Sequence, residues 1–284
     1  MEVPEERIVA INGASQFFPW AAGEFGDRTV WLQSPTFGEW TRAFPHASTY
    51  SDVGDARLHV PHPLPRSGLA VIVNPNNPTG TTIANDEILE ECRDNPDTMY
   101  LIDESFIRFS GQPSIMEELE RNPLGNVVVL QSLSKALGVP GVRIGFVYST
   151  NVDALARFRS SLPVWNMNSI AEKFLELLLK NRPELERSFI QTRSDRDDLR
   201  QRMMRVPRVR SVWRSGGDFV LIELDMDRPT SSFLADRMLS EYKIYVKEVS
   251  AKFGGHCSYW RLAVRHPAEH ELLATTLTTL ISRL

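Results

Sequence analysis

The sequence predicts an α/β fold in which a mostly parallel central sheet carries helices on both faces, followed by a smaller C-terminal α+β domain. In the first two-thirds of the chain, short and nearly continuous apolar runs alternate with helical stretches, which is typical of parallel strands buried on both faces. Near Pro163 the pattern changes to longer helical periodicities followed by further strands. We therefore expect a large domain over residues 1–162 and a small domain over residues 163–284.

The first domain is expected to contain four strands and one polar helix between them. The apolar runs end at polar or turn-forming residues, which sets their limits. The predicted elements are a short strand at Val30–Leu32, a strand at Leu69–Val73, a helix at Ala84–Arg93, and strands at Met99–Ile102 and Val127–Leu130.

The second domain is expected to begin with two helices. Asn168 can cap the first helix, and its apolar residues follow helical spacing. Pro183 fits the first turn of the second helix, which extends to about Arg205. Three strands and a final helix complete the domain, at Phe219–Ile222, Ile244–Val246, Tyr259–Val264 and from Ala268 onward.

Composition excludes several classes of function. The chain has 284 residues, 42% of them hydrophobic and 24% charged, and a net charge of −4, which gives no electrostatic reason to bind nucleic acid. No apolar run reaches the length of a membrane span, and Met1–Arg7 lacks the features of a signal peptide. Cys92 and Cys257 show neither metal nor redox spacing. We expect a cytoplasmic protein without a membrane or nucleic-acid partner.

Two other patterns are interpreted as structural. The histidine pairs in His59–His62 and His266–His270 come without a third ligand at metal spacing, so no metal site is expected. The arginines within Arg193–Arg214 are interleaved with aspartates on a predicted helix. A solvated, ion-paired helix face explains them better than a nucleic-acid surface.

Lys135 has the most informative surroundings in the chain. It follows the strand at Val127–Leu130, lies beside Ser132 and Ser134, and precedes a glycine–proline turn and Arg143. A lone lysine is most often a solvated surface charge, but loops at strand ends are where α/β folds bind ligands. A lysine amine can form a Schiff base, and hydroxyls with a guanidinium can hold a phosphate. The combination predicts a site for pyridoxal 5'-phosphate (PLP).

Two other strand ends carry suitable polar residues. Asp103 follows the strand at Met99–Ile102, and a buried carboxylate there would keep the pyridine nitrogen of PLP protonated. An isolated aspartate at this place is more often a cap or turn residue. Asn77 lies in a proline-rich turn after Leu69–Val73 and would donate a hydrogen bond to the phenolic oxygen, a role for which Asn76 competes.

A glycine turn near the N-terminus provides a second candidate phosphate contact. Residues Ile11–Ser15 lead into a predicted helix, and free backbone N–H groups at a helix start bind anions. Ala14 and Ser15 would be the contacts. Many helices begin in this way, so the motif is informative only together with the others.

The three motifs together resemble a known family. Asn74-Pro-Asn-Asn-Pro-Thr-Gly80, Asp103-Glu-Ser-Phe106 and Ser132-Leu-Ser-Lys…Arg143-Ile-Gly-Phe, in this order, resemble the class I/II aminotransferases of PLP fold type I. The resemblance extends from about Val9 to Leu284 and is greatest to the branch of histidinol-phosphate aminotransferase and threonine-phosphate decarboxylase. It implies a Schiff base at Lys135, and two catalytic residues, Lys135 and Asp103.

The resemblance also implies roles for further residues. Asn77 would bind the phenolic oxygen of the cofactor, and Phe37 would stack on its ring. The phosphate would be held by Ala14, Ser15, Ser132, Ser134 and Arg143. Arg261 would bind the substrate carboxylate, and Arg265, on the same face of a strand, is a weaker candidate.

The same resemblance implies an aminotransferase that moves an amino group between an amino acid or amine and an oxo acid. One alternative is a decarboxylase of a phosphorylated amino acid, because Phe106 stands where aminotransferases usually carry a tyrosine. The chain also begins almost at the glycine turn, so the N-terminal arm of relatives is expected to be missing. We therefore keep an inactive fragment or ligand-sensing domain as a further alternative, and expect a homodimer and a piece of a longer fused protein.

Overall fold

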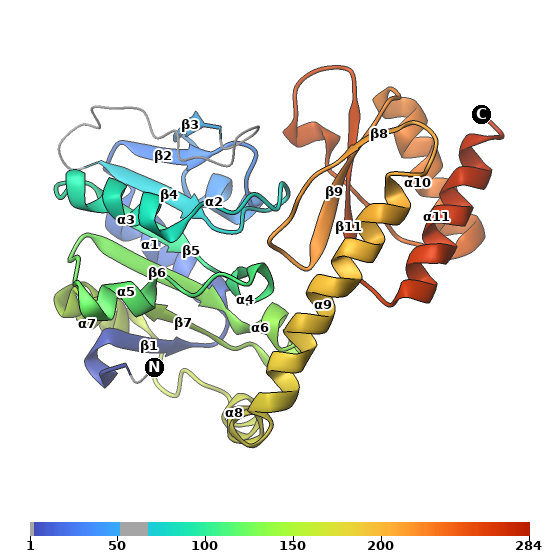
Figure 1. Ribbon diagram of the computed structural model, residues 1–284. Helices are drawn as coiled ribbons and strands as arrows, with labels where there is room; N and C mark the ends of the chain where they lie inside the picture. Colours follow the sequence, from blue (N-terminus) through green and yellow to red (C-terminus); the bar gives the residue numbers. More distant parts are fainter. Residues whose placement is uncertain (1–2, 52–67) are drawn as a thin grey trace.

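A computed structural model describes residues 3–51 and 68–284, which form two sheets. The larger sheet has the strand order β1-β7-β6-β5-β4-β2-β3 (Figure 1). Neighbours from β3 to β6 are parallel, whereas β7 is antiparallel to both β6 and β1. The strands are β1 (Ile8–Ile11), β2 (Val30–Gln33), β3 (Ser48–Tyr50), β4 (Leu69–Val73), β5 (Met99–Asp103), β6 (Val127–Ser132) and β7 (Gly145–Tyr148). The prediction of a mostly parallel α/β sheet is confirmed.

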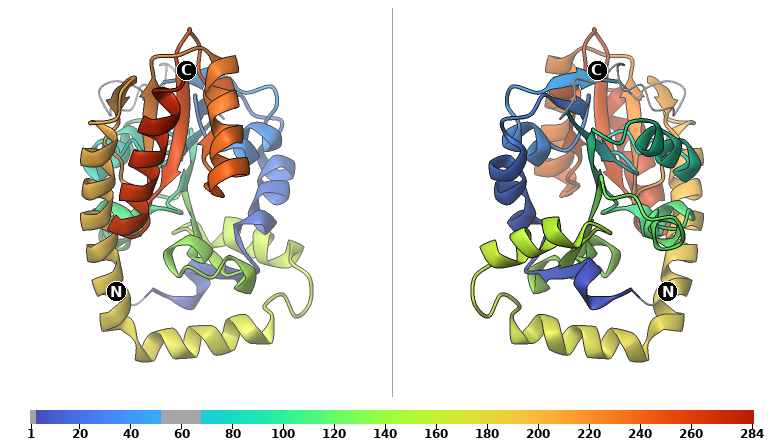
Figure 2. Two further views of the ribbon diagram at one scale, coloured as in Figure 1. Left: turned by 90° about the vertical axis from the view of Figure 1, so that its right-hand side faces the viewer. Right: turned by 90° about the vertical axis from the view of Figure 1, so that its left-hand side faces the viewer.

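Helices cover both faces of this sheet, as the continuous apolar runs predict (Figures 1 and 2). Val71 and Val73 pack in one apolar cluster with α1, α2 and α7, whereas Ala70 and Ile72 pack in another with α3 and α5. Side chains alternate along a strand, so a strand covered on both sides has no polar face. The helices are α1 (Phe17–Phe25), α2 (Gly38–Ala43), α3 (Asn85–Asp94), α4 (Ile107–Ser110), α5 (Met116–Arg121), α6 (Leu133–Ala136) and α7 (Val152–Ser161).

The smaller sheet is antiparallel, with the order β10-β11-β9-β8. Its core lies between one face of the sheet and α9, α10 and α11. The strands are β8 (Val209–Val212), β9 (Phe219–Leu224), β10 (Lys247–Glu248) and β11 (Ser258–Ala263), and the helices are α8 (Ser169–Lys180), α9 (Arg182–Met203), α10 (Arg228–Tyr242) and α11 (Pro267–Ile281). The division of the chain at residue 163 stays a prediction.

Two expectations for this region differ from the structure. The strand predicted at Ile244–Val246 is wrong, because Ile244 N–H bonds to the carbonyl of Met238 at the end of α10 and the strand begins only at Lys247. Arg265 does not share a strand face with Arg261, because β11 ends at Ala263 and Arg265 pairs with Glu269 instead.

The helix α8 lies apart from both cores. Asn168 caps it as predicted, accepting a hydrogen bond from Ala171 N–H at 2.9 Å, and Ala171 is its buried residue. Figure 2 shows α8 extending across the bottom of the molecule, with α9 rising from its end past both sheets. Among residues 3–51 and 68–284, every helix is too short or too polar to cross a membrane.

Candidate active site

A cavity of about 260 Å³ lies where the carboxyl ends of β4, β5 and β6 meet. Every residue predicted to bind the cofactor lines it: Ala14, Ser15, Phe37, Asn77, Asp103, Ser132, Ser134, Lys135 and Arg143. Parallel strands bring their carboxyl ends to one edge of the sheet, so residues far apart in the sequence meet there. The cavity also contains side chains that were not predicted as ligands, among them Phe18, Glu39, Ser105 and Phe106.

One end of the cavity is built to hold an anion. Arg143 Nη2 donates to Ser15 Oγ at 2.9 Å, beside the turn that leads into α1. Gly13 has a φ of +87°, and a side chain there would overlap the guanidinium of Arg143. A glycine is therefore needed both for the backbone angle and for the close approach of the arginine. Together with backbone N–H groups at the start of the helix, this arrangement suits a phosphate.

Asp103 provides a buried negative charge at the same cavity. Its side chain is 3% exposed, and its two oxygens accept hydrogen bonds from Trp40 Nε1 and Ser105 N–H, each at 3.0 Å. The carboxylate is therefore fixed in position. Trp40 lies in α2, 63 residues earlier, and is fully buried. No motif pointed to Trp40, because a buried tryptophan looks like any core residue in a sequence.

Lys135 places its amine near two aromatic rings. Nζ lies 5.1 Å from the centre of the Phe106 ring and 5.9 Å from that of Phe37. Burial lowers the pKa of Lys135, while the nearby carboxylates of Asp103 and Asp218 act in the opposite direction. The lysine is therefore more readily available as a neutral amine, which is the nucleophilic form.

Arg261 links the two sheets at the edge of the cavity. Its Nη1 donates to Asn77 Oδ1 at 2.7 Å, although the two residues are 184 positions apart. With its oxygen engaged, Asn77 has its NH₂ group to offer as a donor. Burial lowers the pKa of Arg261, opposed by the carboxylate of Asp218. Asp218 precedes β9 without any recognisable motif, and sequence reasoning missed it.

The structure separates the two asparagines that competed for one role. Asn76 is completely buried, donates from Nδ2 to Pro35 O at 2.9 Å, and accepts from Thr36 Oγ1 and Asn77 N–H. It holds the turn together and does not line the cavity. Asn77 lines the cavity and is the residue suited to contact a ligand.

The histidine pairs are not brought into a metal-binding group among the residues described. Within 3–51 and 68–284, no three His, Cys, Asp or Glu side chains are placed to hold a metal ion. His59 and His62 lie outside these ranges. His270 is a core residue that accepts from Arg265 N–H and contacts Asp198 Oδ2 at 2.8 Å.

Comparison with known proteins gives consistent matches. Residues 54–269 match the family model "Aminotransferase class I and II". The chain is 32% identical to CMP-5'-(3-aminopropyl)phosphonate synthase of Streptomyces rubellomurinus, over 98% of this chain but only 45% of that protein. It is 29% identical to L-serine phosphate decarboxylase of Sulfurospirillum multivorans, over 99% of this chain and 75% of that protein.

A solved structure also superposes over nearly the whole chain. L-threonine-O-3-phosphate decarboxylase from Porphyromonas gingivalis superposes with a TM-score of 0.86 at 25% identity, over 99% of this chain and 85% of that chain. The chain spans less than half the length of the first three curated relatives, at 45%, 25% and 35%.

Proposed function

This chain belongs to the class I and II aminotransferase family, and we propose that it is a PLP-dependent decarboxylase of an amino acid that carries a phosphate or phosphonate group. The observation that carries PLP-dependent chemistry is the convergence on one cavity of Lys135, Asp103 and Asn77 from three strand ends, with Arg261 from the second sheet bonded to Asn77. This set provides an amine, a buried carboxylate, an amide and a carboxylate-binding guanidinium.

The residues present fit PLP, the cofactor of this family. The absence of a side chain at Gly13 leaves room for the guanidinium of Arg143, which suits the phosphate. The buried carboxylate of Asp103 suits a protonated pyridine nitrogen. When bound, PLP supplies an electron sink that stabilises negative charge at the substrate Cα. Asn77 would bind the phenolic oxygen through its NH₂ group, and Phe37 would pack on the ring.

The protein's own groups then have distinct tasks. Arg261 binds the substrate carboxylate and, through its bond to Asn77, keeps that carboxylate at a fixed place relative to the cavity. Lys135, with a pKa lowered by burial, provides in its protonated form the acid that delivers a proton to the substrate Cα when the carboxylate leaves as CO₂. The rings of Phe37 and Phe106 beside Nζ limit the access of water.

The sequence alone favoured transamination, and the relatives shift the proposal to decarboxylation. One relative that aligns over nearly the whole chain is named a serine phosphate decarboxylase, and a solved threonine phosphate decarboxylase shares the fold. A second such relative, named an aminopropylphosphonate synthase, supports only the phosphonate-bearing ligand. Phe106 also lacks the hydroxyl that a tyrosine would direct at the cofactor. Transamination stays the second candidate, because the matching family is described by that reaction.

The test is product analysis with PLP and O-phospho-L-serine, O-phospho-L-threonine or an α-amino acid whose side chain carries a CMP-linked phosphonate. Decarboxylation predicts CO₂ and an amine, with loss of both in Lys135→Ala and retention in Lys243→Ala, which changes an exposed lysine at the end of α10. An oxo acid without CO₂ would overturn decarboxylation in favour of transamination. Absence of a PLP absorbance band that depends on Lys135 would overturn the enzyme proposal and favour an inactive or ligand-sensing domain.

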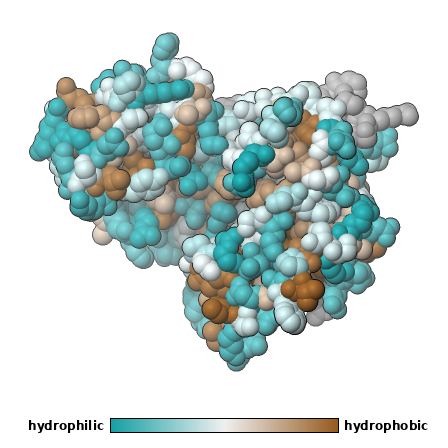
Figure 3. Space-filling model, turned by 180° about the vertical axis from the view of Figure 1, so that it is seen from behind, coloured by the Kyte–Doolittle hydropathy of each residue, from teal (hydrophilic) through white to brown (hydrophobic). Residues whose placement is uncertain are grey.

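We also propose that two copies associate through the surface around α8. Exposed apolar side chains are concentrated there: Val164 is 82% exposed, Trp165 94%, Ile170 71% and Leu179 63%. Figure 3 shows hydrophobic residues near the bottom of the molecule, where α8 lies in Figure 1. Such patches usually mark interaction sites. Light scattering should give a dimer mass that Trp165→Ser with Ile170→Glu reduces, and a wild-type monomer would refute this.

A further inference from the structure

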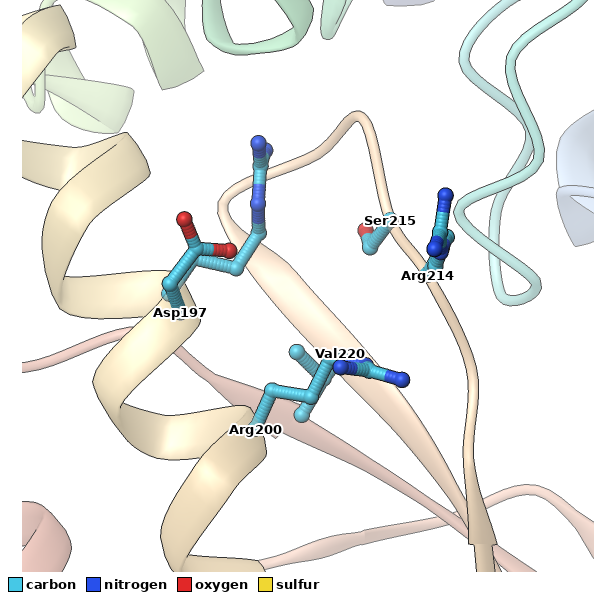
Figure 4. A pocket seen from close by; sticks show the side chains of 6 residues that line it. Asp197, Arg200, Arg214, Ser215 and Val220 are labelled. Carbon is cyan, nitrogen blue, oxygen red and sulfur yellow. The ribbon is translucent and has the colours of Figure 1, made fainter.

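A second cavity, of about 340 Å³, lies across the loop that precedes β9 from the candidate active site. Its walls come from α9, from the segment between β8 and β9, and from β9 itself (Figure 4). It is lined by Arg196, Asp197, Arg200, Arg214, Ser215 and Val220. The lining contains three guanidinium groups and one carboxylate, so it carries a net positive charge. The cavity shares no lining residue with the candidate active site.

The guanidinium groups of this cavity have unused donors. Arg214 makes no hydrogen bond or ion pair with the described part of the chain, and Arg200 donates only from Nε, to Val212 O at 3.3 Å. Figure 4 shows Arg200 extending from α9 toward the segment that carries Arg214 and Ser215. Asp197 lies beside Arg196, whose charge it partly offsets. Arg200, Arg214 and the hydroxyl of Ser215 therefore remain for an oxyanion.

The loop from Arg214 to Asp218 connects this cavity with the candidate active site. Gly216 N–H donates to Gly80 O at 2.8 Å, and a side chain at Gly80 would overlap that of Ser215. Gly80 ends the turn that carries Asn77. On the other side, Arg196 Nη1 donates to Gly217 O at 2.8 Å, next to Asp218. A ligand that holds Arg214 and Ser215 thus acts on a loop packed directly against the residues around Asn77.

We propose that this cavity binds the phosphate group of a small metabolite, distinct from the cofactor and from the substrate at Lys135. Guanidinium pairs recognise phosphate through charge-assisted hydrogen bonds. Occupancy orders the loop 214–218 and through it the turn at residues 76–80. Because such coupling is reciprocal, phosphate binding here and ligand binding at the active site affect each other's affinity by the same factor.

The experiment is a calorimetric titration of the PLP-saturated protein with inorganic phosphate at low ionic strength, where screening is weak. Saturable binding is expected in the wild type. The double variant Arg200→Gln/Arg214→Gln should bind at least about tenfold more weakly, as expected for losing charged hydrogen bonds. Arg187→Gln, which changes an exposed arginine on the same helix, should bind like the wild type. Hydrogen exchange in residues 76–82 should slow with phosphate only where binding persists.

Two results would overturn the proposal. One is equal phosphate affinity in the double variant and the wild type. The other is no saturable binding below about 10 mM phosphate. Arg214→Gln alone separates lost binding from lost folding, because Arg214 is exposed and holds nothing else in place. The titration is repeated in Arg143→Gln, which lacks the predicted contact with the cofactor phosphate. Phosphate should still bind in the second cavity of this variant, so the test does not depend on whether PLP binds.

Discussion

Glu104 should make the stability of this protein depend on pH. Its side chain is 2% exposed and accepts hydrogen bonds from Ile115 N–H at 2.8 Å, Gln131 Nε2 at 2.9 Å and Ser114 Oγ. Burial raises the pKa of Glu104 to about 7, with a smaller contribution from the charge of Asp103, although the three hydrogen bonds act in the opposite direction. Between the ordinary and the raised pKa, the folded protein therefore retains a proton on Glu104 that the unfolded chain loses.

The magnitude follows from the difference between the two states. The ordinary pKa of a glutamate is 4.5, so the shift spans about 2.5 units, or about 3 kcal/mol. Below pH 4.5 both states bind the proton, and the stabilisation is fully present. Between pH 4.5 and 7 only the folded state binds it, so the free energy of unfolding falls as pH rises. Above pH 7 the loss is complete.

Urea denaturation at pH values from 5 to 8 measures this effect. Glu104→Gln removes the titrating group, so the stability difference between wild type and variant should change by up to about 3 kcal/mol across the range. Any effect of replacing the carboxyl group by an amide that does not depend on pH cancels in that comparison. Glu117→Gln, an exposed glutamate on α5, serves as the control and should follow the wild type. Parallel curves for Glu104→Gln and wild type would refute the reasoning.

Three further predictions concern the candidate active site. Trp40→Phe removes the donor to the buried carboxylate of Asp103 and should lower the free energy of unfolding by about 2 kcal/mol in urea denaturation; an unchanged midpoint contradicts this. Gly13→Ala places a side chain at a positive φ and against the guanidinium of Arg143, so PLP should bind more weakly and the free energy of unfolding should fall by about 1–2 kcal/mol. Unaltered PLP binding in a titration would contradict a role for Gly13 in the phosphate site. Because burial lowers the pKa of Lys135, the rate of PLP incorporation should reach half its maximum at a lower pH than with Nα-acetyl-lysine; a midpoint at or above that of the free amine argues against a desolvated lysine.

Local patterns in the sequence predicted much of the larger sheet. β4, β5 and β6 were found within two residues of their limits, because strands buried on both faces are continuous apolar runs. The short strands β1, β3 and β7 were not predicted. They have three or four residues each, as does β2, which was found; runs this short do not reliably stand out from a loop.

The cofactor half of the candidate site was also predictable. Lys135 and Asn77 follow a strand and Asp103 ends one, and the parallel arrangement brings those strand ends together. Knowing that three strands are parallel neighbours is therefore enough to place three distant residues at one edge.

Local sequence patterns were enough to predict the α/β class, the positions of the main strands along the chain and the polar residues at their ends, because apolar periodicity and turn chemistry are local properties. Tertiary structure alone decided that Arg261 bonds to Asn77, that Trp40 holds Asp103, and that the loop before β9 separates two cavities. These contacts depend on how one sheet packs beside another, and no short segment of the chain records that geometry.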